Sequence, residues 1–89
     1  MKIYRRQQKL YSFKDVDNLI ERYIKAGGEA VQTDEGSLGS GNWILFNTTG
    51  KLKSFVINEV YLNEWSSAHT IRGYKKLPKK YEALLENYN

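Results

Sequence analysis

The C-terminal part of the chain contains a basic segment, residues 69–81, with the composition of a phosphate-binding surface. The segment reads HTIRGYKKLPKKY and contains no acidic residue. Its cations alternate with tyrosine, a combination that attracts phosphate groups and offers a ring for stacking on exposed bases. We therefore predict a nucleic-acid-binding role for six side chains of this segment: Arg72, Tyr74, Lys75, Lys76, Lys79 and Lys80.

A second basic segment, residues 1–11, opens the chain and also lacks acidic residues. It reads MKIYRRQQKLY, and we add its Arg5 and Arg6 to the predicted binding residues. The two segments carry formal charges of +4 (residues 1–11) and +5 (residues 69–81), whereas the rest of the chain carries −5, which gives a net charge of +4. Because the positive charge is concentrated near the two ends, we expect the two segments to meet on one surface.

The sequence supplies few residues for catalysis. His69 is the only histidine, and it follows Ser66 and Ser67 closely, but a nucleophile and its base are defined by geometry in the fold and by an orienting third group. Glu59 and Glu64 would need a bend between them to act as an acid–base pair, because residues five apart on a strand face opposite sides. We expect that the protein is not an enzyme.

The sequence offers no recognisable metal or cofactor site. It has no cysteine and a single histidine, and the acidic pair Asp34-Glu35 lacks the alternating oxygen ligands of a calcium loop. The glycine-rich residues 36–41 precede a predicted strand and lack both the Gly-Lys-Ser/Thr ending and the following helix of a P-loop. We expect no cofactor and no metal.

Length and composition indicate one domain that covers residues 1–89. The 89 residues, of which 40% are hydrophobic and 13% aromatic, are enough to fill a single core. No apolar run approaches the roughly 20 residues needed to cross a bilayer. No apolar stretch follows the first charged residues, as one would in a secretory signal. We therefore expect a cytoplasmic protein that does not bind membranes.

Hydrophobic periodicity predicts a helix over about residues 13–26 and a short C-terminal helix over about residues 78–87. Ser12 and Asp15 form a variant of the capping box before the first helix, and Gly27-Gly28 supplies its stop. Pro78 suits the first position of the second helix. The apolar stripe of the first helix consists of Val16, Leu19, Ile20, Tyr23 and Ile24.

Runs rich in branched and aromatic residues predict strands at residues 29–33, 43–47, 52–62 and 70–74, and residues 2–6 could add an edge strand. The turn sequence Asn47-Thr48-Thr49-Gly50 joins the second and third of these runs into a hairpin. The third run is largely apolar on both faces, as expected of a central strand that is covered on each side or of a barrel-like wrap. The predicted fold is a small α+β domain, with two helices packed on a mostly antiparallel sheet of three to five strands.

Two functions are compatible with these features. The first is a small, non-enzymatic nucleic-acid-binding protein that uses basic segments 1–11 and 69–81 and is largely insensitive to base sequence. The alternative is a protein–protein interaction module whose basic surface binds an acidic protein partner. Binding to nucleic acid should weaken steeply with salt, whereas capture of a protein partner should resist nuclease.

Overall fold

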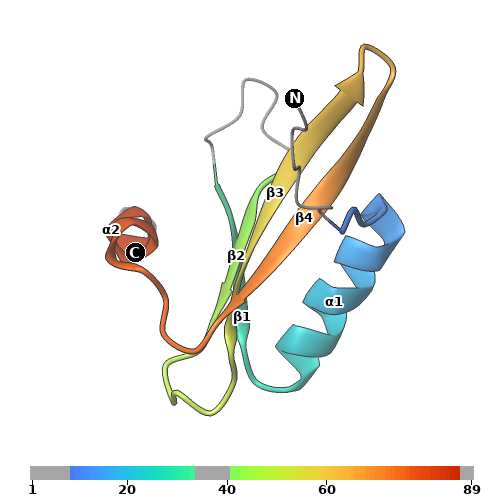
Figure 1. Cartoon of the computed structure of the whole chain (residues 1–89). Coiled ribbons are helices and arrows are strands. Elements are labelled where there is room, and N and C mark those ends of the chain that lie inside the picture. Colours follow the sequence, from blue (N-terminus) through green and yellow to red (C-terminus); the bar gives the residue numbers. More distant parts are fainter. Residues whose placement is uncertain (1–8, 34–40, 87–89) are drawn as a thin grey trace, which may run out of the picture.

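The computed structural model describes residues 9–33 and 41–86, which form two helices and a four-stranded antiparallel sheet. The elements are α1 (Phe13–Lys25), β1 (Glu29–Gln32), β2 (Trp43–Phe46), β3 (Ser54–Asn63), β4 (Ser66–Tyr74) and α2 (Lys79–Glu86). Each strand pairs with the next along the chain, so the sheet order is β1-β2-β3-β4 (Figure 1). The predicted α+β fold is confirmed, and the strand expected at residues 2–6 lies outside the described residues.

One face of the sheet packs against α1. Buried Val16 and Tyr23 of the helix pack with buried Leu45 of β2 and Ile57 of β3. Ile24, which the sequence placed in the same apolar stripe, is instead 53% exposed. The prediction for Ile24 was wrong because successive helical residues are rotated by about 100° around the helix axis. Tyr23 faces the sheet, so the side chain of the next residue, Ile24, points away from it.

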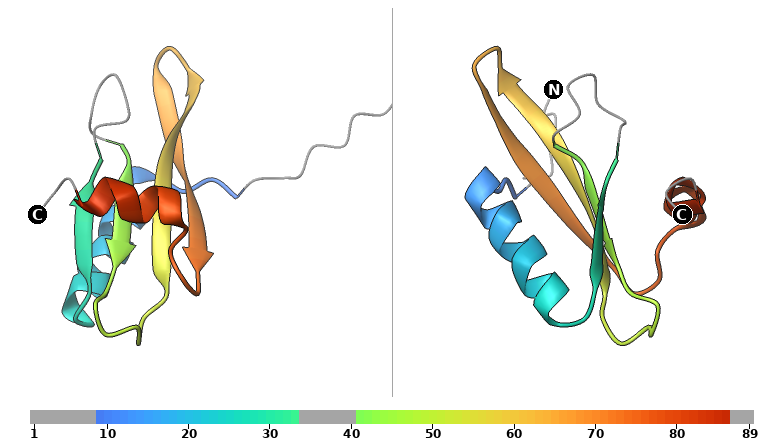
Figure 2. Two further views of the ribbon diagram at one scale, coloured as in Figure 1. Left: turned by 90° about the vertical axis from the view of Figure 1, so that its left-hand side faces the viewer. Right: turned by 180° about the vertical axis from the view of Figure 1, so that it is seen from behind.

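The opposite face carries α2, which crosses the strands (Figure 2). Buried Ile44, Val56 and Leu77 form the centre of this second apolar cluster. The carbonyl of Pro78 accepts hydrogen bonds from the N–H groups of Tyr81, at 3.0 Å, and Glu82, at 3.2 Å. The helix α2 therefore begins at Lys79, one residue after the predicted start. The side chains packed around this centre are Phe46, Tyr74, Tyr81, Leu84 and Leu85.

Both ends of α1 have the caps that the sequence predicted. The Asp15 N–H donates to Ser12 Oγ at 3.2 Å, and the Ser12 N–H donates to Asp15 Oδ2 at 3.1 Å. The Asp15 carboxylate also accepts a hydrogen bond from Ser12 Oγ at 2.9 Å. The two hydrogen bonds that the carboxylate accepts, the one from the backbone N–H first, lower the pKa of Asp15 below its ordinary value. At the other end Gly27 adopts a φ of 99°, which a residue with a Cβ adopts only under strain, and the N–H groups of Gly27 and Gly28 pair with carbonyls of the last turn.

The connection between β2 and β3 is held in shape by the side chain of Asn47. Its Oδ1 accepts a hydrogen bond from the Leu52 N–H at 3.3 Å, and its Nδ2 donates to the Leu52 carbonyl at 2.6 Å and to the Tyr23 hydroxyl at 3.2 Å. The Tyr23 hydroxyl in turn donates to the Lys53 carbonyl at 2.7 Å. The connection is therefore fixed internally and also tied to α1.

The strand β4 begins at Ser66, four residues before the predicted start. The residues around Trp65 are polar, but only Glu64 and Trp65 form the turn between β3 and β4. Polar side chains suit this strand because β3 supplies the ladder partners, with Tyr61 opposite Ser67. The register shifts by one residue between Tyr61 and Asn63, so the intervening Leu62 forms a β-bulge.

The burial of Leu45 can be tested by truncating it. Leu45 has no exposed surface, so we expect Leu45→Ala to leave a cavity and to lower the free energy of unfolding by about 2–5 kcal/mol. The control Ile24→Ala, at an exposed position, should cost less than about 0.5 kcal/mol. Urea denaturation of the two variants measures both values, and equal losses would contradict the assigned packing of α1 on the sheet.

The role of Asn47 can be tested in the same way. We expect Asn47→Ala to lower the free energy of unfolding by about 1–3 kcal/mol, because it leaves the half-buried N–H and carbonyl of Leu52 without their partner. Thr48→Ala changes an exposed side chain of the same connection and should cost less than about 0.5 kcal/mol. A loss at position 47 no larger than at position 48 would show that the connection does not need this side chain.

The capping box predicts a specific pH dependence. Because Asp15 has a lower pKa in the folded than in the unfolded chain, its ionised form stabilises the fold above the unfolded pKa, and this contribution is lost as the pH falls through the folded pKa. We expect Ser12→Ala to raise the pKa of Asp15 toward its ordinary value. The substitution removes the hydroxyl donor but keeps the backbone N–H, which is the larger cause, so the expected rise is partial. An NMR titration of the Asp15 carboxyl carbon measures the rise, and an unchanged pKa would exclude the Ser12 hydroxyl as a cause.

Candidate nucleic-acid interface

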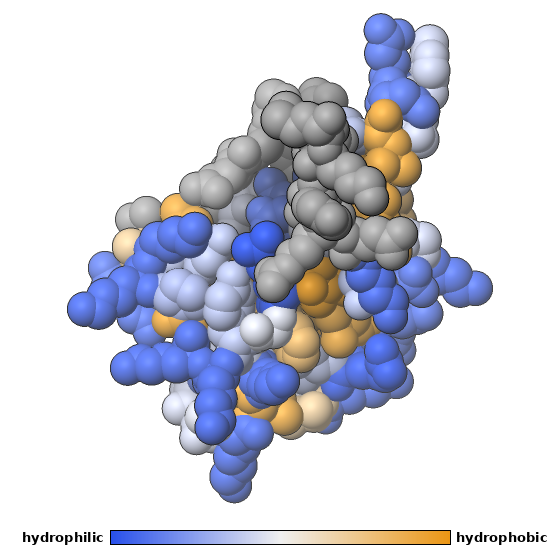
Figure 3. Space-filling view, in the orientation of Figure 1, coloured by the Kyte–Doolittle hydropathy of each residue, from blue (hydrophilic) through white to orange (hydrophobic). Residues whose placement is uncertain are grey.

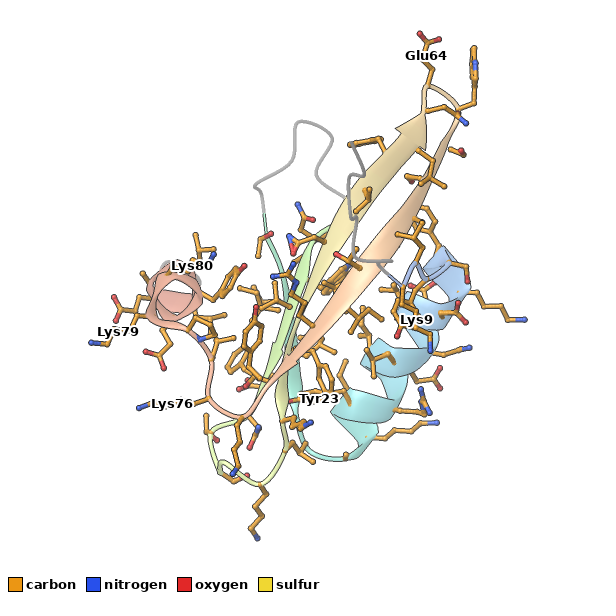
Figure 4. The ribbon with its side chains drawn as sticks, viewed as in Figure 1. Lys9, Tyr23, Glu64, Lys76, Lys79 and Lys80 are labelled. Carbon is orange, nitrogen blue, oxygen red and sulfur yellow. The ribbon has the colours of Figure 1, made fainter. Side chains whose placement is uncertain are left out.

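The predicted binding residues of the C-terminal segment lie on β4, in the connection between β4 and α2, and in the first turn of α2. Arg72 is exposed at the edge of the sheet, opposite Val56 and therefore on the face that carries α2. Lys75 and Lys76 are exposed in the connection, and Lys79 and Lys80 are exposed on the helix. Figure 4 shows Lys76 and Lys79 pointing into solvent, away from the sheet.

The structure adds two lysines that the sequence analysis did not select. The β3–β4 ladder ends at the pair Ser54 and Tyr74, so Lys53 and Lys75 leave the sheet at the same point. Lys53 reaches toward β4, since a Cβ built on Gly73 would lie 3.9 Å from its Cδ. Figure 1 shows the β2–β3 and β4–α2 connections side by side at one end of the sheet. We call this surface the basic end and define it by four exposed lysines, Lys51, Lys53, Lys75 and Lys76.

Lys51 and Lys53 were missed because they belong to residues 12–68, whose summed charge is negative. Composition by segment does not show which connections meet in space. The available signal was the pairing of the predicted strands 52–62 and 70–74 as antiparallel neighbours, which places the start of one beside the end of the other. The predicted topology did not include a strand order.

The lysines of the basic end have no carboxylate partner in the part of the chain that the structure describes. The ion pair found among the described residues lies elsewhere, on α1, where Lys25 Nζ is 3.1 Å from Glu21 Oε1. Positive charges that lie close together without counter-charges raise one another's electrostatic energy. A bound polyanion would lower that energy, so the arrangement favours an anionic partner.

Tyr74 is half-buried rather than fully exposed on this surface. Its ring lies 6.3 Å from the ring of Tyr81, centre to centre, within the apolar cluster under α2. Lys80 Nζ lies 4.9 Å from the centre of the Tyr81 ring, which suits a cation–π contact. The stacking of Tyr74 on a base stays a prediction, because much of the ring is used in packing.

The N-terminal basic segment meets β4 as far as the structure describes it. The backbone of Tyr11 exchanges two hydrogen bonds of 2.8 Å with that of His69, which places residues 9–11 along the edge of β4. Lys9 lines a hollow of about 150 Å³ together with Arg72, so one cation of each basic segment borders the same space. Arg5 and Arg6 lie outside the described residues, and their meeting with Arg72 stays a prediction.

Three of the residues considered for catalysis, Glu59, Ser67 and His69, lie on the face of the sheet that carries α1, whereas Glu64 lies in the β3–β4 turn. Glu59 lies opposite His69 in the ladder, and Ser67 Oγ donates to Glu59 Oε2 at 2.9 Å. His69 is 1% exposed and packs edge-on against the ring of Phe13, 4.5 Å away between ring centres, and its Nδ1 has no hydrogen-bond partner. The serine is thus coupled to the carboxylate, and no hydrogen bond joins it to the histidine among the described residues.

Residues 9–33 and 41–86 contain neither a cluster of metal-ligating side chains nor a membrane-spanning helix. No three side chains of His, Asp or Glu gather there as a metal site would require. Neither α1 nor α2 is long and apolar enough to cross a membrane.

No protein-family model, no curated protein and no solved structure matches this chain.

Proposed function

We propose that this chain is a non-enzymatic nucleic-acid-binding domain that binds phosphates electrostatically and largely without regard to base sequence. The observation that carries the proposal is the convergence of two connections at one end of the sheet, which brings Lys53 beside Lys75; Lys51 and Lys76 lie in the same two connections. Arg72 on one side and the first turn of α2 on the other extend this surface. The proposal places the protein in the cytoplasm.

The chemistry of the basic end suits a repeating row of phosphates. A lysine ammonium is a compact charge on a flexible stem, so it can follow a phosphate backbone without fixing a particular base. Lys79 and Lys80 lie in the first turn of α2, where the helix dipole is already positive and lysine is unfavourable by a few tenths of a kcal/mol. A phosphate bound beside this turn would be stabilised both by the lysines and by the helix end.

An acidic protein surface is the second candidate partner, and the position of Tyr74 favours it. Base stacking needs an exposed ring, and the ring of Tyr74 is half-buried against Tyr81. A cationic surface without a free ring binds carboxylates as readily as phosphates. Partner chemistry therefore has to be separated by experiment.

The proposed interface predicts a salt dependence that is specific to named lysines. If the four lysines of the basic end each neutralise one phosphate, a plot of log K against log salt for duplex DNA should have a slope of about −3.6, from about −0.9 per phosphate. Lys76→Glu and Lys53→Glu should each flatten the slope by about one unit. Fluorescence anisotropy of a labelled duplex across a salt series measures these slopes.

The matched control is Lys14→Glu, which makes the same charge change at an exposed position of α1. All three variants change the net charge of the protein by the same amount. Lys14→Glu removes no lysine of the basic end, so it should leave the slope unchanged. Poly-glutamate tested at the same salt concentrations separates the two partner chemistries. Retention of poly-glutamate but not of DNA or RNA would reject the nucleic-acid proposal in favour of an acidic protein partner.

A further inference from the structure

The β3–β4 hairpin extends beyond the rest of the sheet as a two-stranded arm, residues 60–68. The strand β2 pairs with β3 only over Phe55–Ile57, whereas the pairing of β3 with β4 continues to the tip (Figure 1). The arm exposes large apolar side chains: Trp65 is 91% exposed, Tyr61 59% and Leu62 53%. Figure 3 shows apolar surface just below its hydrophilic tip. Clusters of exposed apolar side chains of this kind mark interaction surfaces.

The charge of the arm differs from that of the basic end. Glu64 is the single charged residue of the arm. The residue just before the arm, Glu59, is also acidic. An acidic arm repels phosphate, so nucleic acid is an unsuitable partner for it. The arm suits an apolar recess with a cationic rim.

The same chain has such a recess, between α1 and the lower half of β4. This groove has a volume of about 880 Å³. Half-buried Leu19, Phe55 and Ile71 line it as apolar side chains. The cations on its rim are Lys9, Arg22 and Lys25, and its acids are Asp15 and Glu21.

The acids of the groove already have partners within α1 or its cap. Glu21 pairs with Lys25, and Asp15 accepts the hydrogen bonds of the capping box. Arg22 has no carboxylate within ion-pair distance in the described part of the chain. The groove therefore combines an apolar lining with an available guanidinium, which complements an arm that combines Trp65 with Glu64.

We propose that the arm of one copy binds in the α1–β4 groove of a second copy, with Trp65 on the apolar lining and Glu64 beside Arg22. A chain cannot fill its own groove in this way, because the arm projects away from the end of α1 that carries Arg22 (Figure 1). Tryptophan and arginine are the residue types that most often dominate the binding energy of interfaces. This proposal is independent of nucleic-acid binding, since it uses none of the basic-end lysines.

The size of the contact indicates two-fold symmetry. A buried aromatic side chain contributes about 150–250 Å², so the exposed parts of the arm residues and the matching groove surface together bury about 700 Å² in one contact. Specific interfaces bury about 1,200–2,000 Å². Two reciprocal contacts give about 1,400 Å², and a reciprocal arrangement closes as a dimer instead of growing into a filament.

Sedimentation equilibrium of the full chain, without nucleic acid and over about 1 µM to 1 mM, tests the proposal. We expect a monomer–dimer equilibrium, which Trp65→Ser weakens at least about tenfold, as the loss of an anchor residue should. The control Ile24→Ser removes another exposed apolar side chain, one outside arm and groove, and should dimerise like the wild type. A chain that stays monomeric throughout, or that dimerises equally with Trp65→Ser, would overturn the proposal.

Charge reversal tests the pairing of arm with groove. Glu64→Arg and Arg22→Glu should each weaken the dimer about tenfold, and the double variant should recover to within about threefold of the wild type, because the pair is restored with opposite polarity. A double variant as weak as the single ones would reject this pairing. In a Trp43→Phe background Trp65 is the only tryptophan, and its emission should shift to shorter wavelength on dimerisation. An emission that does not change with concentration would contradict burial of Trp65.

Discussion

The register of the β3–β4 pair fixes the positions of both lysine-bearing connections and of the arm. Ser54 lies opposite Tyr74 at one end of the ladder, and Tyr61 lies opposite Ser67 near the other. The first pairing places the two lysine-bearing connections side by side, and the second builds the arm. A slip of one residue would also exchange the side chains that face α1 with those that face α2, since side chains alternate between the faces of a strand. The single register of β3 and β4 therefore determines the core, the basic end and the arm.

Much of the fold could be predicted because the relevant signals are local. The apolar spacing of α1, its cap at Ser12 and its stop at Gly27 all lie within one helix, and the two apolar faces of β3 can be read from alternation alone. The start of β4 could not be read in this way. Ser66 and Ser67 have no strand preference of their own, and they are held in the strand by pairing with β3.

The candidate site was predictable only where it is continuous in sequence. Lys75 and Lys76 stand in a run of cations, so they were found, whereas Lys53 is 22 residues away along the chain and joins them only through the ladder. The half-burial of Tyr74 has a similar origin, because the ring is covered by a helix that follows it. Local sequence shows which side chains are cationic or aromatic. Tertiary packing determines which of them remain free to bind.

The bulge at Leu62 has a consequence for solubility. A long, regular strand edge offers an unbroken row of N–H and C=O groups to which further strands can add, and this is a common route to aggregation. An extra residue in one strand interrupts that row and increases the local twist. The hairpin can therefore project beyond the sheet with apolar side chains on it while its backbone remains a poor template for open-ended growth of β-structure.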